Sequence, residues 1–259
     1  MTPDIVVDVG NSRMKWGRCD AERVRGKVSL AHDTPVDWKD QALIWGASEQ
    51  TRWVVAGVAP REVERFCGWL ASRGTVPTVV TSDLFEAANE TGLVTEVESL
   101  QQIGVDRLLS SLAAFRRQTV PSPVVVINVG TAMTVDFVKA DGVHVGGVIL
   151  PGPQLMSQSL HNHTAKLPAI KIEPKLPSTF LGRNTEQAIQ VGIANAVLSV
   201  AYQLVWDWVN HVGRPPWVYA TGGDVGYFEG FEFSANVAGF TIDPFLTLEG
   251  IRLAAEAMG

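Results

Sequence analysis

The sequence predicts an α/β protein made of two similar lobes. Short β-branched runs bounded by Gly, Pro, Asn or Asp recur along the 259 residues, as expected for buried strands. Segments with a helical period of apolar residues lie between these runs, and such alternation is typical of α/β proteins. A third observation is an internal echo, because residues 8–12 (DVGNS) and 128–132 (NVGTA) each follow a strand-like run with a glycine turn and a hydroxyl residue. The echo predicts two halves, each with one phosphate-facing turn.

Strand-like runs occur at five places in the chain. They lie at residues 5–7, 53–55, 79–80, 124–127 and 217–220. Each is short, rich in β-branched or aromatic residues and flanked by turn formers, which is typical of a buried strand.

Helical periodicity accounts for the longer segments. Helices are expected at residues 61–72, 105–118, 185–211 and 246–258. The first follows Pro60 and stops before Gly74, which are ordinary boundary signals. The longest has an apolar stripe from Ile189 to Trp208, and Gly213 is placed to end it in a left-handed cap. Alanines widen that stripe, which favours close packing of another helix or a second subunit.

The echo also divides the chain. The lobes are expected at residues 1–118 and 119–259, with a cleft between them. A chain of 259 residues can bury a core in such lobes without metal or disulfide staples.

Composition excludes several classes of protein. Lys and Arg number 21 against 27 acidic residues, so the net charge is −6, which argues against sequence-independent nucleic-acid binding. Cys19 and Cys67 cannot form a disulfide scaffold, and no Cys/His cluster indicates zinc. The first ten residues lack the pattern of a signal peptide, and uninterrupted apolar runs fall far below the ~18 residues of a membrane span. We therefore expect a cytoplasmic protein with no nucleic-acid or membrane partner.

The first glycine turn has the chemistry of a phosphate site. Asp8 ends a strand, where its carboxylate can hold Mg²⁺ through water. Gly10 lets backbone N–H groups approach phosphate oxygens, which a side chain would block. The alternative is an ordinary strand followed by an Asx turn. Neither a G-x-x-x-x-G-K-[ST] nor a G-x-G-x-x-G motif occurs, so P-loop and Rossmann nucleotide binding are not indicated.

The second turn repeats this pattern. Gly130 follows four branched apolar residues, and the hydroxyls of Thr131 and Thr134 suit the β- and γ-phosphates of a nucleotide. A strand end would have the same composition, but the pairing with the first turn favours phosphate binding.

An acidic and a basic residue stand side by side at a helix start. Asp106 can accept a proton from a substrate hydroxyl, and Arg107 can anchor an anionic substrate group. The alternative is that Asp106 stabilises the helix dipole and Arg107 makes a surface pair. Glycine pairs at 146–147 and 222–223 suit either a ligand lying against the backbone or tight turns.

The order of these motifs resembles that of the type III pantothenate kinase family. The motifs are residues 8–12, 104–107 (GVDR), 130–134 (GTAMT), 146–152, 181–185 (LGRNT), 221–223 (TGG) and 244–250 (PFLTLEG). The resemblance covers essentially the whole chain. It implies two duplicated ribonuclease-H-like lobes of the actin-like ATPase fold, with nucleotide in the cleft between them. It also implies phosphorylation of pantothenate by ATP, the first step of coenzyme A synthesis, in a homodimer.

The resemblance assigns the acceptor side of the site to a few residues. Asp106 is implied to be the general base on the pantothenate hydroxyl, and Gly104, Val105 and Arg107 to bind pantothenate. Thr185 is implied to reach the pantothenate of the partner subunit, which is consistent with a dimer surface on the apolar helix that follows.

The nucleotide side follows from the same resemblance. The implied ATP-binding residues are Asp8, Gly10, Asn11, Ser12, Lys15, Gly130, Thr131, Thr134, Gly222 and Gly223. Asp8 is also implied to hold Mg²⁺ near the phosphates. Phosphoryl transfer requires positioning and charge neutralisation more than covalent chemistry, and these residues are of the types that supply both.

Two positions depart from the family pattern. The family usually has Asp where this chain has Asn128, and that carboxylate supports a monovalent cation beside the phosphates. Asn128 keeps an oxygen ligand without the charge, so we expect weak dependence on K⁺ or NH₄⁺. The family also commonly has a tyrosine near the position of Val97, where it caps the pantothenate pocket.

These departures keep three hypotheses open. The first is an active pantothenate kinase, favoured by the presence of Asp8, Asp106, Arg107 and both turns. The second, favoured by Val97, is a kinase of another small hydroxy acid. The third, favoured by Asn128, is a regulator that binds nucleotide or pantothenate without catalysis.

Overall fold

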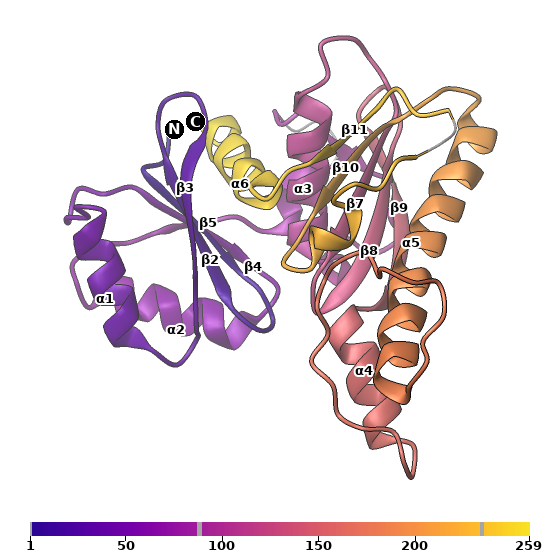
Figure 1. Ribbon diagram of the computed structural model, residues 1–259. Helices are drawn as coiled ribbons and strands as arrows, with labels where there is room; N and C mark the ends of the chain where they lie inside the picture. The colour runs from indigo at the N-terminus through magenta and orange to yellow at the C-terminus, as the bar shows by residue number, and fades with distance from the viewer. Residues whose placement is uncertain (1, 87–89, 234–235) are drawn as a thin grey trace. The chain divides into compact units, whose positions relative to one another are not determined.

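The structure is a computed structural model that describes residues 2–86, 90–233 and 236–259. The chain divides into two compact units (Figure 1). The first unit comprises Met1–Arg117, Gly142–His144 and Phe245–Gly259, and the second comprises Gln118–Asp141 and Val145–Pro244.

The first unit is a mixed sheet with helices on both faces. Its strands are β1 (Ile5–Val9), β2 (Met14–Cys19), β3 (Val24–Leu30), β4 (Trp53–Gly57) and β5 (Thr78–Val79). Its helices are α1 (Pro35–Ile44), α2 (Pro60–Ala71), α3 (Val105–Arg116) and α6 (Leu246–Ala257). The strand order is β3-β2-β1-β4-β5, in which β1 pairs antiparallel with β2 and parallel with β4. A short strand, β6 (Val94–Thr95), pairs with Val143 and His144.

An aromatic core lies between this sheet and the helices α1 and α2. The rings of Trp16 and Trp53 meet edge to face at 5.0 Å, and Trp38 from α1 meets Phe66 from α2 at 5.5 Å. Val7 and Val9 of β1 point into the same core. Because side chains alternate along a strand, Asp8 points to the opposite face of the sheet, which is the face that α6 covers.

Helix α6 belongs to the first unit, whereas the sequence placed residues 245–259 in the second lobe. It packs against α3, where the hydroxyls of Ser110 and Thr247 are hydrogen-bonded at 2.8 Å. The buried Arg252 of α6 donates to Glu249, whose carboxylate accepts the Val24 amide at 2.9 Å. The expected lobes simply divided the chain into two consecutive halves. The last helix instead returns to the first unit, because its apolar face packs against α3.

The α3–α6 contact provides a stability prediction. A Cβ atom added at Gly250 would lie 2.0 Å from the carbonyl oxygen of Leu109, which is backbone and cannot turn away. We expect Gly250→Ala to lower the unfolding free energy of the first unit by about 1–3 kcal/mol, as overpacked cores do. Urea unfolding followed by tryptophan fluorescence measures the change. Gly68→Ala is the control, because among the described residues no atom approaches within 4 Å of that position. Equal stability of the two variants would contradict the prediction.

The second unit repeats the sheet of the first. Its strands are β7 (Val124–Val129), β8 (Ala132–Val138), β9 (Val143–Pro151), β10 (Trp217–Thr221) and β11 (Gly239–Ile242), and its helices are α4 (Pro153–Asn162) and α5 (Thr185–Val212). These strands are ordered β11-β10-β7-β8-β9. β7 pairs antiparallel with β8 and parallel with β10, as β1 does with β2 and β4. The predicted duplication is therefore present in the strand order.

Helix α5 forms the core of the second unit with one face of this sheet. Ile193, Val197 and Val205 of α5 are buried in one apolar cluster with Ile127 and Val129 of β7. Gly213 ends the helix with φ = 67°, as predicted. Figure 1 shows α5 running beside α4. By length and mean hydropathy (1.5) α5 is also able to cross a membrane, a test that the core helix of a soluble protein passes equally well.

Most predicted elements lie within a residue or two of their expected bounds, and the misses share a cause. No strand or helix was predicted where the structure has β2, β3, β6, β8, β9, β11, α1 and α4. In α1, Trp38 is the buried residue, so no helical stripe was visible. The glycine pair at 146–147 lies inside β9, where Gly146 has φ = 113°. Weak local periodicity hides elements that tertiary packing stabilises.

Candidate active site

The first predicted phosphate turn joins β1 to β2. The amide of Gly10 donates to the carbonyl oxygen of Arg13 at 3.1 Å, which closes a tight turn. Asn11 and Ser12 are exposed at its tip. The turn thus presents backbone and a hydroxyl to solvent at the end of β1, where the sequence placed a phosphate contact.

Asp8 lies just before this turn and is 95% buried, since its exposed fraction is 5%. Lys15 stands opposite it across the β1–β2 pair, with its Nζ atom 3.6 Å from Asp8 Oδ2. Burial raises the pKa of the Asp8 carboxyl above its usual value, and Lys15 opposes that shift. A buried carboxylate whose charge is costly gains from a further cation nearby. The residue therefore fits a metal ligand better than an ordinary turn residue.

The second predicted phosphate turn joins β7 to β8 in the same way. The amide of Gly130 donates to the carbonyl oxygen of Ala132 at 3.0 Å, and Thr131 is exposed at the tip. Gly152 closes the turn from outside, since its amide donates to Thr131 O at 3.0 Å. A Cβ atom at Gly152 would lie 1.9 Å from Gly130 O, so only glycine fits.

Asn128 lies before the second turn as Asp8 lies before the first. It is paired across the sheet with Thr134 of β8 and Thr221 of β10. Within the described chain, the buried Thr134 hydroxyl makes no hydrogen bond. The row Thr221–Asn128–Thr134 therefore places neutral oxygen and nitrogen groups where the first unit has a carboxylate and a lysine.

The glycine pair after β10 lies against this row. Gly222 has φ = 109°, and a Cβ atom there would lie 2.1 Å from Val129 O and 2.7 Å from Asn128 Oδ1. The next residue, Gly223, is exposed, and the Asp224 amide donates to Val129 O at 2.9 Å. The residues predicted for the second nucleotide contact are thus neighbours within one unit.

The first unit contains a counterpart of Gly222 at Gly57. The sequence patterns did not single out Gly57 as a site residue. Gly57 ends β4, and a Cβ atom there would lie 2.6 Å from Val9 O. The following residue, Val58, donates its amide to the same oxygen at 3.1 Å. A glycine two residues after the strand-like run 53–55 was the available signal, and the similar glycine at 222 after the run 217–220 could have shown that it matters.

The predicted acid lies at the start of α3. Gly104 is the N-cap residue, and Asp106 and Arg107 are half-buried in the first helical turn. The Arg107 amide donates to Gly104 O at 3.0 Å and to Asp106 Oδ1 at 3.0 Å. A pocket of about 620 Å³ in the first unit is lined by Gly104 and Val105 and also by Gly57 and Val58. The motif therefore borders a cavity that can receive a small molecule.

Val97 lies in the same unit, between β6 and the 3₁₀ turn Leu100–Gln102. It is half-buried, and its amide donates to Thr95 Oγ1 at 3.4 Å. Nothing among its described contacts assigns it to a substrate, so its role stays a prediction.

Thr185 begins α5 and is exposed. Two reciprocal hydrogen bonds fix this helix end: the Gln187 amide donates to Asn184 Oδ1 at 2.9 Å, and the Arg183 amide donates to Gln187 Oε1 at 3.0 Å. Gly182 is needed beside them, because a Cβ atom would lie 2.2 Å from the Ala188 amide nitrogen. The segment 182–185 thus holds Thr185 in place.

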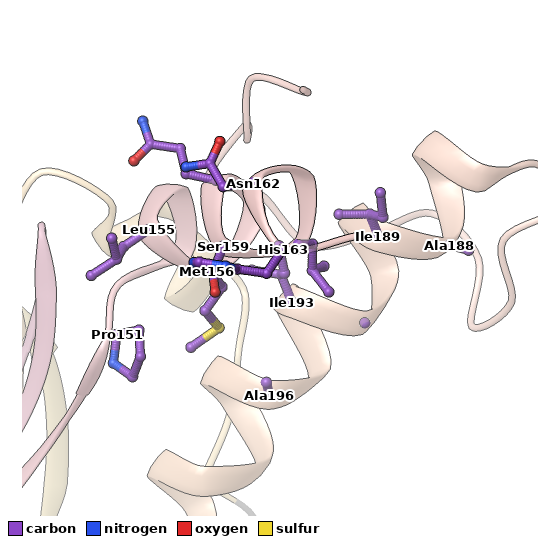
Figure 2. A pocket seen from close by; sticks show the side chains of 13 residues that line it. Pro151, Leu155, Met156, Ser159, Asn162, His163, Ala188, Ile189, Ile193 and Ala196 are labelled. Carbon is purple, nitrogen blue, oxygen red and sulfur yellow. The ribbon is translucent and has the colours of Figure 1, made fainter. Parts of the chain in front are cut away.

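An apolar groove of about 770 Å³ lies between α4 and α5. Figure 2 shows Leu155 and Met156 of α4 on one side and Ile189, Ile193 and Ala196 of α5 on the other. The exposed residues of α5 in the groove and beside it are small or polar, namely Ala188, Gly192, Asn195, Ala196 and Ser199. The exposed surface of α5 beside the groove is therefore made of small or polar residues.

The structure therefore assembles the predicted residues in groups. Asp8, the first turn and Lys15 lie where β1 turns into β2 in the first unit, and Asp106 with its neighbours lies at the start of α3 in the same unit. Asn128, the second turn and the 222–223 pair form a group in the second unit. Thr185 belongs to the same unit and is the first residue of α5.

Solved structures show the class of fold. The activator of 2-hydroxyisocaproyl-CoA dehydratase from Clostridium difficile is 12% identical, with 100% of this chain and 96% of that chain covered and a TM-score of 0.52. MreB 5 of Spiroplasma citri is 10% identical, with 98% and 96% covered and a TM-score of 0.50. The predicted fold class, the duplicated α/β architecture of the actin-like ATPases, is confirmed.

Sequence comparison then identifies the family. The family model for type III pantothenate kinase matches residues 5–206. The type III pantothenate kinase of Desulfosudis oleivorans is 29% identical, with 98% of each chain covered, and that of Hyphomonas neptunium is 32% identical, with 87% of this chain and 89% of the relative covered. This chain belongs to the type III pantothenate kinase family. The predictions of a phosphotransferase and of pantothenate phosphorylation for coenzyme A synthesis are confirmed at the level of the family.

Proposed function

We propose that this chain transfers the γ-phosphoryl group of ATP to the hydroxyl of pantothenate, with Asp106 as the general base. The observation that carries the proposal is the motif 104–107 at the start of α3, where a half-buried acid and an arginine directly follow Gly104 and Val105, which line the 620 Å³ pocket. Asp106 takes the hydroxyl proton while the hydroxyl oxygen attacks phosphorus, and ADP leaves. Arg107 pairs with the carboxylate of pantothenate and so orients the acceptor.

The nucleotide phosphates are proposed to bind at the two glycine turns. The exposed tips at 10–12 and 130–131 offer backbone N–H groups and hydroxyls, the groups that bind phosphate oxygens. Lys15 adds a positive charge beside the first turn. Gly223 leaves room for the adenosine end, because a Cβ atom there would have no described atom within 4 Å, and Gly222 lets this turn lie directly against Val129 O.

Asp8 is the proposed ligand of Mg²⁺. Across the described residues, no group of three His, Cys, Asp or Glu side chains could enclose a metal ion. The single carboxylate of Asp8 suits Mg²⁺, which proteins commonly hold by one or two carboxylates together with substrate phosphates. When bound, Mg²⁺ neutralises charge on the β- and γ-phosphate oxygens.

A single assay separates the open hypotheses. ADP release is measured with pantothenate and with a panel of small hydroxy acids, at saturating Mg·ATP. Turnover with pantothenate is expected. Turnover with another acid alone would indicate a different substrate, for which the Val97 departure is the relevant feature. ATP binding by calorimetry without turnover on any acid would indicate a binding protein.

A homodimer is proposed to form through the exposed face of α5 and the groove beside it. The small residues on this face allow close approach of a second helix, and the apolar groove would otherwise face water. Thr185 at the end of the same helix would then reach the acceptor of the partner subunit.

The dimer surface can be tested by charge insertion. We expect Ala196→Arg to convert the protein from dimer to monomer, because an arginine would have to be buried against its own copy. Light scattering after size-exclusion chromatography measures the mass. Asp40→Arg on the exposed side of α1 is the control and should leave the mass unchanged. A monomeric unmodified protein, or a dimeric Ala196→Arg variant, would refute the proposed surface.

Asn128 gives a prediction about monovalent cations. A carboxylate there would place a full charge beside the phosphates and need a cation to balance it, whereas the amide does not. We expect turnover to depend weakly on K⁺ and the Asn128→Asp variant to depend on it strongly. Turnover is measured against KCl, with choline chloride holding ionic strength constant. Strong K⁺ activation of the unmodified protein would contradict the charge argument.

The protein is further proposed to act in the cytoplasm without membrane or nucleic acid. The net charge of −6 supports the absence of a nucleic-acid partner, since nucleic-acid binding relies on basic surface. The burial of one face of α5 in the core of its unit supports the absence of a membrane partner, because a membrane-spanning helix would need that face for lipid or for other spanning helices.

A further inference from the structure

Gly104 has an environment that its backbone conformation does not explain. Its dihedral angles are φ = −60° and ψ = 124°, which any residue adopts without strain. The constraint is space: a Cβ atom there would lie 2.5 Å from Asp106 Oδ1 and 3.2 Å from Val58 Cγ1. The carboxylate of Asp106 thus occupies the place that a side chain at 104 would take.

Val58 closes the other side of this narrow gap. Its amide donates to Val9 O at 3.1 Å, which ties it to the end of β1, one residue beyond Asp8. Gly57 makes that approach possible, because a Cβ atom there would lie 2.6 Å from the same oxygen. A side chain at 104 could not move away from Asp106 without meeting a residue anchored to the sheet.

The Asp106 carboxylate is held by a contact that depends on this space. Its Oδ1 atom lies 3.0 Å from the Arg107 amide, which donates to it. This bond folds the carboxylate back over residue 104 and selects one side-chain orientation. A methyl group at 104 would push Oδ1 out of that orientation while leaving the helix start intact, because a rotating carboxylate yields more easily than backbone.

We propose that Gly104 is a positioning residue for Asp106: the absence of a side chain at 104 lets the carboxylate take the orientation in which it accepts the substrate proton. The inference rests on the proposed function, since it concerns the base of that reaction. It differs from a role in substrate contact, because the steric effect acts through the carboxylate and is lost when the carboxylate is absent.

A double-mutant cycle tests this dependence. Gly104→Ala should lower kcat about 10- to 100-fold, the cost of misplacing a catalytic group by a fraction of an ångström to one ångström. The KM for ATP and the unfolding temperature should stay unchanged. In an Asp106→Asn background, where turnover is already slow, the same substitution should change kcat less than about twofold, since coupled residues are not additive. Equal losses in both backgrounds would overturn the inference.

A second cycle tests the geometry on the other side. Val58→Ala removes the atom 3.2 Å from the added methyl group, so Gly104→Ala combined with Val58→Ala should recover part of the lost kcat. Gly68→Ala, at a position with no described neighbour within 4 Å, is the matched control and should leave kcat unchanged. No recovery in the double variant would overturn the steric explanation, because the added methyl group would then not be confined between Val58 and Asp106.

A spectroscopic measurement makes the test independent of activity. The amide proton of Arg107 should shift upfield in Gly104→Ala, because its bond to Asp106 Oδ1 is lost, and Gly68→Ala should leave it in place. An unmoved Arg107 amide would overturn the inference. If the unmodified protein released no ADP with pantothenate, the proposed function would fall, whatever the Arg107 signal showed. Normal turnover in Gly104→Ala, with an active parent, would overturn only the positioning role.

Discussion

Replacing Asp106 by asparagine is expected to lower kcat by about 10²–10⁴, the usual contribution of general base catalysis. Asparagine keeps the size of the side chain and loses the site that accepts the proton. The acid lies in the first turn of α3, with its Oδ1 atom bonded to the Arg107 amide. An asparagine oxygen can keep that bond, so the helix start and the pocket beside it should remain intact.

The nucleotide side provides the control for this variant. The dissociation constant of Mg·ATP should change less than twofold, since Asp106 is proposed to face the acceptor. Steady-state kinetics with pantothenate and calorimetry with ATP measure the two quantities. Turnover at the unmodified rate would remove Asp106 from the mechanism. A parallel loss of ATP binding would instead indicate a general disturbance of the first unit.

Asp8→Asn is expected to reduce turnover by about 10²–10³, because charge neutralisation by a metal is worth several kcal/mol in phosphoryl transfer. The substitution makes the first turn resemble the second, where Asn128 occupies the corresponding position. The amide retains an oxygen but not the charge that attracts Mg²⁺. The variant should need a much higher Mg²⁺ concentration for half-maximal rate.

Asp8→Asn should leave the thermal stability of the protein unchanged or raise it, although it lowers turnover. Asp8 is buried, and burial disfavours its charged form, which is why its pKa is raised even with Lys15 at 3.6 Å. Removing that charge relieves a desolvation cost. Thermal unfolding without nucleotide should show a melting temperature no lower than that of the unmodified protein. If Asp8→Asn unfolds, and its folded fraction has normal Mg²⁺ dependence, Asp8 is a structural residue and not a metal ligand.

Much of the site could be located from local patterns. A β-branched run followed by Asp8 and Gly10 predicted a strand and a turn, and β1 and the β1–β2 turn lie there. The helix start at 104–107 was predicted from residue types and spacing, and α3 begins at Val105. Such features depend on neighbours within a few residues, so a short stretch of sequence is enough to predict them.

The missed features depend on residues far apart in the chain. Gly57 matters because Val9 O lies where its side chain would be. At Gly104, which the sequence did indicate, the distant residue Val58 closes one side of the space, and no local pattern reports that contact. The groove likewise needs residues from both α4 and α5, which are separate in the chain. No periodicity reports these contacts, since each partner by itself has an ordinary local sequence.

The sequence by itself determined the class of the protein: alternating strands and helices, two echoing glycine turns and a motif order that resembles one kinase family. Tertiary structure decided which elements belong together. Helix α6, last in the chain, packs with α3 and β1 of the first unit, where Gly250 lies against the Leu109 carbonyl and Arg252 is buried with Glu249. The physical reason is that hydrophobic burial and close packing act between surfaces and not along the chain. A local pattern predicts that a helix has an apolar face, and only the folded molecule decides what that face covers.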